Sequence, residues 1–146
     1  MTRKKATLLL LITVFLPIGI VSVFLCFRQV IERVSEIHRD FAALWNVTDA
    51  LQIYVLSTQE WPKEWDCLIP SLQLVEPRYA DDGISFLRQR VDVNFAVDMC
   101  STIQDDVWYV RLRTDRMEGE EQIANDRLRS MIARIRIDGE NDLNSH

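Results

Sequence analysis

The chain has 146 residues, of which 48% are hydrophobic and 27% are charged, and its formal net charge is -5. A chain of this length holds one domain. Three of the 17 Lys and Arg residues lie at residues 3–5. The rest of the chain therefore has 14 basic and 22 acidic residues, a formal net charge of -8. This acidity argues against nucleic acid as a partner, because nucleic-acid binding requires a basic surface.

The first predicted element is an uncharged apolar segment, residues 6–27, which follows a basic flank at residues 1–5. About 20 apolar residues are enough to cross a hydrocarbon core of roughly 30 Å. A cleaved signal peptide is the alternative, but the run exceeds the usual apolar region of about 7–15 residues and no A-x-A-like site follows. We therefore expect a transmembrane signal-anchor helix and a single-pass membrane protein. The basic flank favours a C-terminal domain outside the cytoplasm.

The next segment, residues 28–57, keeps a helical pattern but is amphipathic. Apolar residues recur from Val30 to Val55 at alternating spacings of four and three, broken only by Thr48, and no Pro or Gly interrupts them. This is a heptad seam, and it predicts one nearly continuous helix of about 50 residues with the segment before it. The predicted packing seam comprises Val34, Ile37, Phe41, Leu44, Leu51 and Val55.

The seam has two interpretations. One is a parallel coiled-coil dimer or a helix that binds another protein, which would make the membrane and a protein partner or second copy the expected partners. The other is a face that packs on the chain's own domain. Trp45, Ile53 and Tyr54 widen the apolar surface beyond a narrow seam, and this favours intramolecular packing.

Residues 58–138 are expected to form a small α+β domain. In the stretch QEWPKEWDCLIP, Pro62 is well placed to open a short helix, and Trp61, Trp65 and Leu68 then share one apolar face. The two Trp residues are either a clamp for a ligand or part of the core. A small domain needs large buried side chains, so we favour a structural aromatic corner of Trp61, Pro62, Trp65 and Leu68.

Two segments of the domain alternate apolar and polar residues, as strands with one buried face do. They are residues 91–99 and 107–113, and they predict an antiparallel pair with a long connection. In the second, Trp108 should face the core and Tyr109 the opposite side. Residues 84–87 are expected to add an edge strand.

A helical pattern at residues 124–136, which Asn125 or Asp126 could cap, precedes a tail at 139–146 that we expect to be disordered. The predicted fold class is therefore α+β. The N-terminal transmembrane helix continues into a long amphipathic helix packed on a small antiparallel sheet, and a C-terminal helix follows.

Two of the three Cys residues, Cys67 and Cys100, lie in the domain. A domain outside the cytoplasm permits a disulfide, so this pair is a candidate bridge. The alternative is two buried free thiols, because spacing alone does not show that the two residues approach one another.

Sequence motifs for catalysis are absent: the chain has no G-x-S-x-G, H-E-x-x-H or Gly-rich phosphate loop. His occurs only at His38 and His146. The acidic pairs at 81–82 and 105–106 could bind a cation or support an envelope enzyme, but adjacent Asp residues in turns are usually solvated. We predict no catalytic, cofactor or metal site, and therefore not an enzyme.

The order of a basic start, an apolar half-helix with a proline, an amphipathic half-helix and a segment with Tyr and Pro, LQIYVLSTQEWPKEW at 51–65, resembles type IV pilins and pseudopilins. That resemblance implies a small antiparallel sheet packed on the long helix and a role as a subunit of a secretion or fibre system. Residues 3–14, RKKATLLLLITV, lack the Gly and Glu of the prepilin cleavage motif. The segment WPKEWDCL at 61–68 also resembles a motif in short, uncharacterised bacterial membrane-anchored proteins.

The predicted function is a membrane-anchored, non-catalytic module for interaction or assembly outside the cytoplasm. A pilin-like subunit is the alternative.

Overall fold

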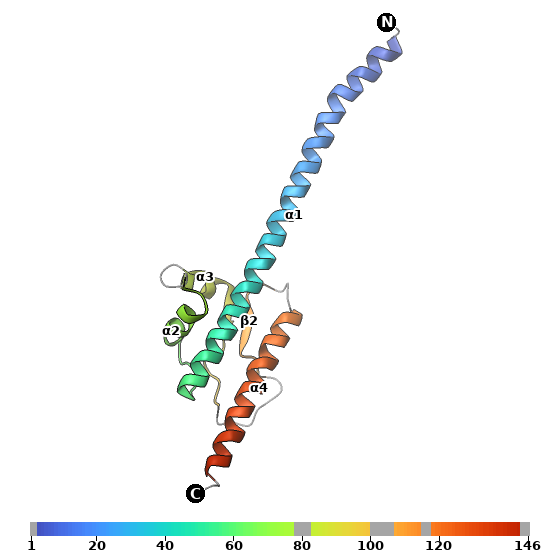
Figure 1. Cartoon of the computed structure of the whole chain (residues 1–146). Coiled ribbons are helices and arrows are strands. Elements are labelled where there is room, and N and C mark those ends of the chain that lie inside the picture. The colour runs from blue at the N-terminus through green and yellow to red at the C-terminus, as the bar shows by residue number, and fades with distance from the viewer. Residues whose placement is uncertain (1–2, 78–82, 100–106, 115–117, 144–146) are drawn as a thin grey trace. The chain divides into compact units, whose positions relative to one another are not determined.

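The computed structural model of the chain describes residues 3–77, 83–99, 107–114 and 118–143, with side chains from Pro17 to residue 137 within these ranges. The described residues form four helices and two strands in the order α1, α2, α3, β1, β2, α4 (Figure 1). The chain divides into two compact units, Met1–His38 and Arg39–His146. Helix α1 (Arg3–Thr58) contributes to both units.

The predicted long helix is present as α1, whose 56 residues include Pro17. Among the residues that the structure describes, however, no helix combines the length and apolar character that a membrane span requires. The prediction of a transmembrane signal anchor at 6–27, and with it the single-pass membrane localisation, is therefore wrong. A stretch of about 20 residues from Pro17, where the described side chains begin, already includes the charged residues Arg28, Glu32 and Arg33.

Helix α1 ends where its backbone turns left-handed. Gln59 has a φ of 60°, a conformation that commonly stops a helix just beyond its last turn. Its N–H donates to the carbonyl of Val55 at 2.9 Å, and Thr58 Oγ1 donates to the carbonyl of Tyr54 at 2.9 Å. These bonds satisfy carbonyl groups that the end of a helix would otherwise leave unpaired.

The core of the second unit lies along the C-terminal half of α1. Between Ala43 and Val55, one face of α1 is fully buried, and residues from all the other elements pack against it. The buried hydrophobic residues of this core are Ala43, Leu44, Val47, Ala50, Leu51, Val55, Trp61, Leu68, Leu72, Leu87, Val91, Val93, Tyr109, Val110, Leu112, Ala124, Leu128 and Ile132.

Two short helices follow α1. Helix α2 (Trp65–Val75) begins three residues later than predicted, because Glu64, and not a residue before Pro62, occupies its N-cap position. Helix α3 (Gly83–Arg90) occupies the segment in which an edge strand was predicted, so that prediction is wrong. In this window of four residues, Ile84 and Phe86 fit the strand period whereas Ile84 and Leu87 fit the helix period, so the pattern alone does not decide between them.

The sheet has only two strands, β1 (Val91–Val93) and β2 (Val110–Leu112). They pair antiparallel, with Val91 opposite Leu112 and Val93 opposite Val110, and these four side chains face the core. Each strand is much shorter than the alternating segment that predicted it. The described chain is therefore mostly helical, and the predicted α+β class with a small sheet packed on the long helix is wrong.

Asn94 explains why β1 ends early. Its side-chain Oδ1 accepts a hydrogen bond from the N–H of Ala96 at 3.1 Å, which turns the chain within two residues. Its side-chain Nδ2 donates to the carbonyl of Trp108 at 3.0 Å, and its carbonyl accepts from Trp61 Nε1 at 2.8 Å. These bonds end the pairing of β1 with β2, although apolar and polar residues continue to alternate as far as Met99.

Helix α4 (Glu118–Leu143) covers the free edge of β2 with two side chains. Asn125 Oδ1 accepts from the N–H groups of Tyr109, at 2.6 Å, and Val110, at 2.9 Å, while its Nδ2 donates to the carbonyl of Val110 at 2.9 Å. Glu121 Oε1 accepts from the N–H of Leu112 at 2.8 Å. Asn125 was expected to cap a helix that begins at 124; instead, α4 begins six residues earlier and Asn125 takes the place of a neighbouring strand.

The Asn125→Ala variant should therefore be less stable than the native chain by about 2–3 kcal/mol, because each unsatisfied buried backbone group costs about 1–3 kcal/mol and water reaches part of this site. Urea unfolding followed by circular dichroism measures the loss. Gln122→Ala, at an exposed position of the same helix, is the matched control and should change stability by no more than about 0.5 kcal/mol. Equal losses for the two variants would contradict a strand-edge role for Asn125.

Candidate functional site

The structure divides the predicted packing seam into two parts. Leu44, Leu51 and Val55 are fully buried in the core of the second unit, as the intramolecular interpretation requires. Val34 and Ile37 are 60% and 42% exposed, and Phe41 is 38% exposed. The C-terminal residues of this heptad pattern therefore pack in the domain core. The N-terminal residues are not buried by any described part of the chain.

Within the first unit, the exposed part of the pattern extends further towards the N-terminus than the predicted seam. Six apolar residues, which we call the exposed seam, continue the spacing of three and four without a break and are 42–70% exposed. They are Ile20, Val23, Phe27, Val30, Val34 and Ile37.

Charged residues of α1 lie away from the exposed seam. In the heptad that the seam defines, Arg28 and Glu32 occupy outward positions, and they form an exposed ion pair with 2.9 Å between Arg28 Nε and Glu32 Oε1. Phe24 and Ile31 flank the seam on one side and widen it, at 66% and 53% exposure. From Arg28 to Ile37, α1 thus has a wide apolar face and a polar back, whereas before Arg28 the outward residues Ile18, Val21 and Leu25 are apolar and exposed as well.

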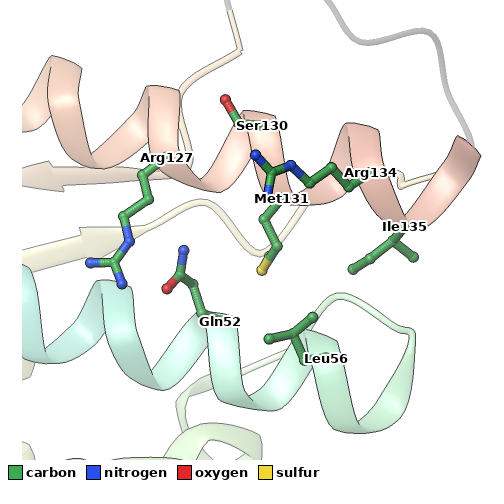
Figure 2. A pocket seen from close by; sticks show the side chains of 7 residues that line it. All are labelled: Gln52, Leu56, Arg127, Ser130, Met131, Arg134 and Ile135. Carbon is green, nitrogen blue, oxygen red and sulfur yellow. The ribbon is translucent and has the colours of Figure 1, made fainter. Parts of the chain in front are cut away.

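A second candidate site is a groove in the second unit between α1 and α4, with a volume of about 630 Å³. Figure 2 shows Gln52 and Leu56 reaching up from α1, and Arg127 and Met131 reaching towards them from α4. The remaining lining residues, Ser130, Arg134 and Ile135, also come from α4. The lining therefore combines an apolar floor with two guanidinium groups and contains no carboxylate.

Arg127 is held in place by two contacts outside the groove lining. Its Nη1 lies 2.9 Å from Asp49 Oδ1, and its guanidinium lies 5.7 Å from the centre of the Trp45 ring. Both members of the ion pair are about two-fifths exposed, so the pair positions the side chain more than it stabilises the fold. The guanidinium keeps further N–H donors for a ligand, because Arg has five.

The aromatic corner has its members in different environments. Trp61 and Pro62 are buried, as is Leu68 in α2, and Trp61 packs on Tyr109 with 5.5 Å between ring centres. Trp65 is half-buried, and its ring meets the edge of Phe95 at 6.0 Å. Trp61, through its hydrogen bond to the Asn94 carbonyl, and Trp65, through Phe95, both contact the segment after β1.

Tyr109 was expected to face away from the core, yet it is 3% exposed. Its ring fills the space beside Trp61, and burial raises the pKa of its hydroxyl above the usual value near 10, partly offset by the neighbouring Arg129. Trp108, expected in the core, is half-buried, and the guanidinium of Arg111 lies 5.0 Å above its ring. Both residues lie before β2, whose own residues keep the predicted alternation of buried Val110 and Leu112 with exposed Arg111.

Cys67 is a half-buried free thiol in α2, close to Tyr54 of α1. Burial, followed by the neighbouring thiol of Cys67, raises the pKa of the Tyr54 hydroxyl. Cys100, its predicted partner, lies outside the described residues, so the bridge between Cys67 and Cys100 stays a prediction.

The predicted carboxylate pairs at 81–82 and 105–106 also lie outside the described residues. In the part of the chain that the structure describes, no three His, Cys, Asp or Glu side chains gather closely enough to hold a metal ion. Sequence reasoning missed the groove because its two walls are more than 70 residues apart in the chain. The only local signal was the spacing of Arg127 and Arg134, seven residues apart on one helix.

Comparison of the chain with protein-family models, with curated proteins and with solved structures finds no match.

Proposed function

We propose that the chain is a non-catalytic assembly protein that associates with further copies of itself through the exposed seam of α1. The observation that supports this proposal is the unbroken heptad spacing of six exposed apolar side chains from Ile20 to Ile37. Fully burying one such side chain contributes about 1.5–3 kcal/mol, so a seam of this length can hold helices together.

The pattern favours a second copy of the chain as the occupant. A parallel arrangement places each seam residue opposite its own equivalent, so identical helices match along the whole seam. The Arg28–Glu32 pair remains on the outward surface in that arrangement, where it stays solvated. Ile and Val occupy the core positions of the heptads except for Phe27, and Phe24 and Ile31 widen the seam, which favours assemblies of more than two helices.

Sedimentation velocity of the full-length chain tests this proposal. We expect an oligomer for the native chain and a monomer for the double variant Val30→Glu/Val34→Glu, because each copy then brings like charges into the seam. The expected effect is a rise of the dissociation constant by about a hundredfold or more.

The double variant Gln29→Glu/Ser35→Glu is the matched control. It adds the same two charges at outward heptad positions and should sediment like the native chain. A monomeric native chain, or equal dissociation of the two double variants, would refute the assembly proposal.

The pilin-like alternative stays a prediction. The length of α1 is in keeping with it, whereas a sheet of two three-residue strands is smaller than the resemblance implied.

A further inference from the structure

We propose that the groove between α1 and α4 is the docking site for an acidic amphipathic helix of a partner protein. This site lies in the second unit and uses none of the residues of the exposed seam, so it goes beyond the proposed self-assembly.

The floor of the groove is apolar and accessible. Leu56 is 58% exposed although its neighbour Val55 is fully buried, and Met131 and Ile135 are half-buried beside it. Figure 2 shows Leu56 and Met131 facing one another across the groove from α1 and α4. An apolar side chain that enters between them would lose its contact with water on both sides.

The charge of the groove determines whether an acidic or a basic partner can bind. Arg127 and Arg134 are the only charged lining residues, and neither Asp nor Glu is among the seven that form the groove. Arg127 is positioned by Asp49, whereas Arg134 is exposed and has no ion-pair partner among the described residues. A carboxylate would therefore meet two guanidinium groups that can donate hydrogen bonds, while a basic partner would be repelled.

The spacing of these charges fits a helix. Arg127 and Arg134 lie seven residues apart, which is two turns or about 10.5 Å along α4. A partner helix that lies along α4 would present carboxylates two turns apart to them, with an apolar residue between that faces Met131. The volume of about 630 Å³ is far more than a single ion needs and lies within the size range of sites that bury larger ligands.

The test uses a fluorescent 18-residue helical peptide with a Leu stripe and two Glu residues seven positions apart beside it. Its matched control has Lys at both Glu positions. Fluorescence anisotropy with the full-length chain should show binding of the Glu peptide, at least about tenfold weaker binding of the Lys peptide, and a loss of affinity as salt rises.

Variants of the chain locate the binding. Arg134→Glu should weaken binding of the Glu peptide by about tenfold or more and should strengthen binding of the Lys peptide, because one of the two positive charges of the lining becomes negative. Arg111→Glu makes the same charge reversal on the exposed face of β2, outside the groove, and should leave the affinity unchanged. Circular dichroism should show that both variants keep the native helical content.

Absence of Glu-peptide binding, equal binding of the two peptides, or equal effects of Arg134→Glu and Arg111→Glu would overturn the proposal. If Arg134→Glu instead changes the oligomeric state without peptide, a second copy occupies the groove, and the partner-helix proposal is wrong. Disruption of the exposed seam by Val30→Glu/Val34→Glu should leave peptide affinity unchanged, so failure of one proposal is distinguishable from failure of the other.

Discussion

The Trp61→Ala variant is expected to lose about 3–5 kcal/mol of the free energy of unfolding, the range for removal of a buried Trp. Trp61 is only 7% exposed, and its ring lies 5.5 Å from that of Tyr109. Its indole Nε1 donates to the carbonyl of Asn94 at 2.8 Å, so the truncation also leaves this part-buried carbonyl without its donor. Urea unfolding followed by circular dichroism measures the loss.

Two matched variants separate the contributions at this corner. Trp61→Phe keeps most of the apolar contact but removes the hydrogen bond, and should cost about 1–2 kcal/mol. Trp65→Ala should cost about 1–2 kcal/mol, because Trp65 is half-buried and its ring touches Phe95 only at an edge. A larger loss for Trp65→Ala than for Trp61→Ala would contradict the assignment of Trp61 as the buried anchor.

The Asp40→Ala variant is expected to lose a comparable amount, about 3–5 kcal/mol, the cost of removing one partner from a buried ion pair. The Asp40 side chain is 3% exposed and pairs with Arg90 at the end of α3, which is 20% exposed. Its second oxygen accepts from Thr114 Oγ1 at 3.2 Å. One carboxylate therefore joins α1 to α3 and to the segment after β2.

A double-mutant cycle shows whether the loss comes from the Asp40–Arg90 interaction. In an Arg90→Met background the same Asp40→Ala change should cost less by more than about 1 kcal/mol, because the ion pair is then already removed. Additive losses in thermal or urea unfolding would contradict the coupling. Asp92→Ala, which removes the partner of exposed Arg113, provides the surface control and should cost less than about 1 kcal/mol.

The long helix was predictable because its evidence is local and repeated. Heptad spacing over several turns, with no Pro or Gly in residues 28–57, leaves helix as the consistent solution, and α1 runs through that whole segment. The same spacing did not reveal where the seam passes from exposed residues to residues buried in the domain core. Leu44 and Val30 occupy equivalent heptad positions, and only the tertiary structure shows that the first is buried and the second exposed.

The strands were predicted too long because alternation describes a face and does not fix the pairing. In β1, a single Asn94 side chain bonds the backbone at Ala96 and ends the ladder after three residues. For β2, the missing neighbour strand is replaced by Asn125 and Glu121 of α4. Alternation does not report such side-chain bonds to the backbone, so it suggested a larger sheet than the described residues form.

The candidate sites differ in the same way. The sequence pattern predicted the part of the exposed seam from Val30 to Ile37, and the structure added Ile20, Val23 and Phe27 and showed that the described residues leave all six exposed. The groove needed the structure entirely, because Leu56 and Met131 belong to helices that no local pattern brings together. The burial of Asp40 was not predictable either. Nothing in the sequence around this acidic residue of α1 indicated that it would pair with Arg90.

The most direct test of self-assembly through the exposed seam is disulfide crosslinking of the full-length chain in a Cys26→Ser background. In a parallel assembly, Ile37 faces its equivalents at a distance that a disulfide can bridge, whereas Leu44 is fully buried in its own domain. We predict that Ile37→Cys forms a covalent dimer on mild oxidation, seen on a non-reducing gel, and that Leu44→Cys and the Cys26→Ser parent do not. An Ile37→Cys chain that stays monomeric under oxidation, or that crosslinks no more than Leu44→Cys, would contradict the proposed assembly.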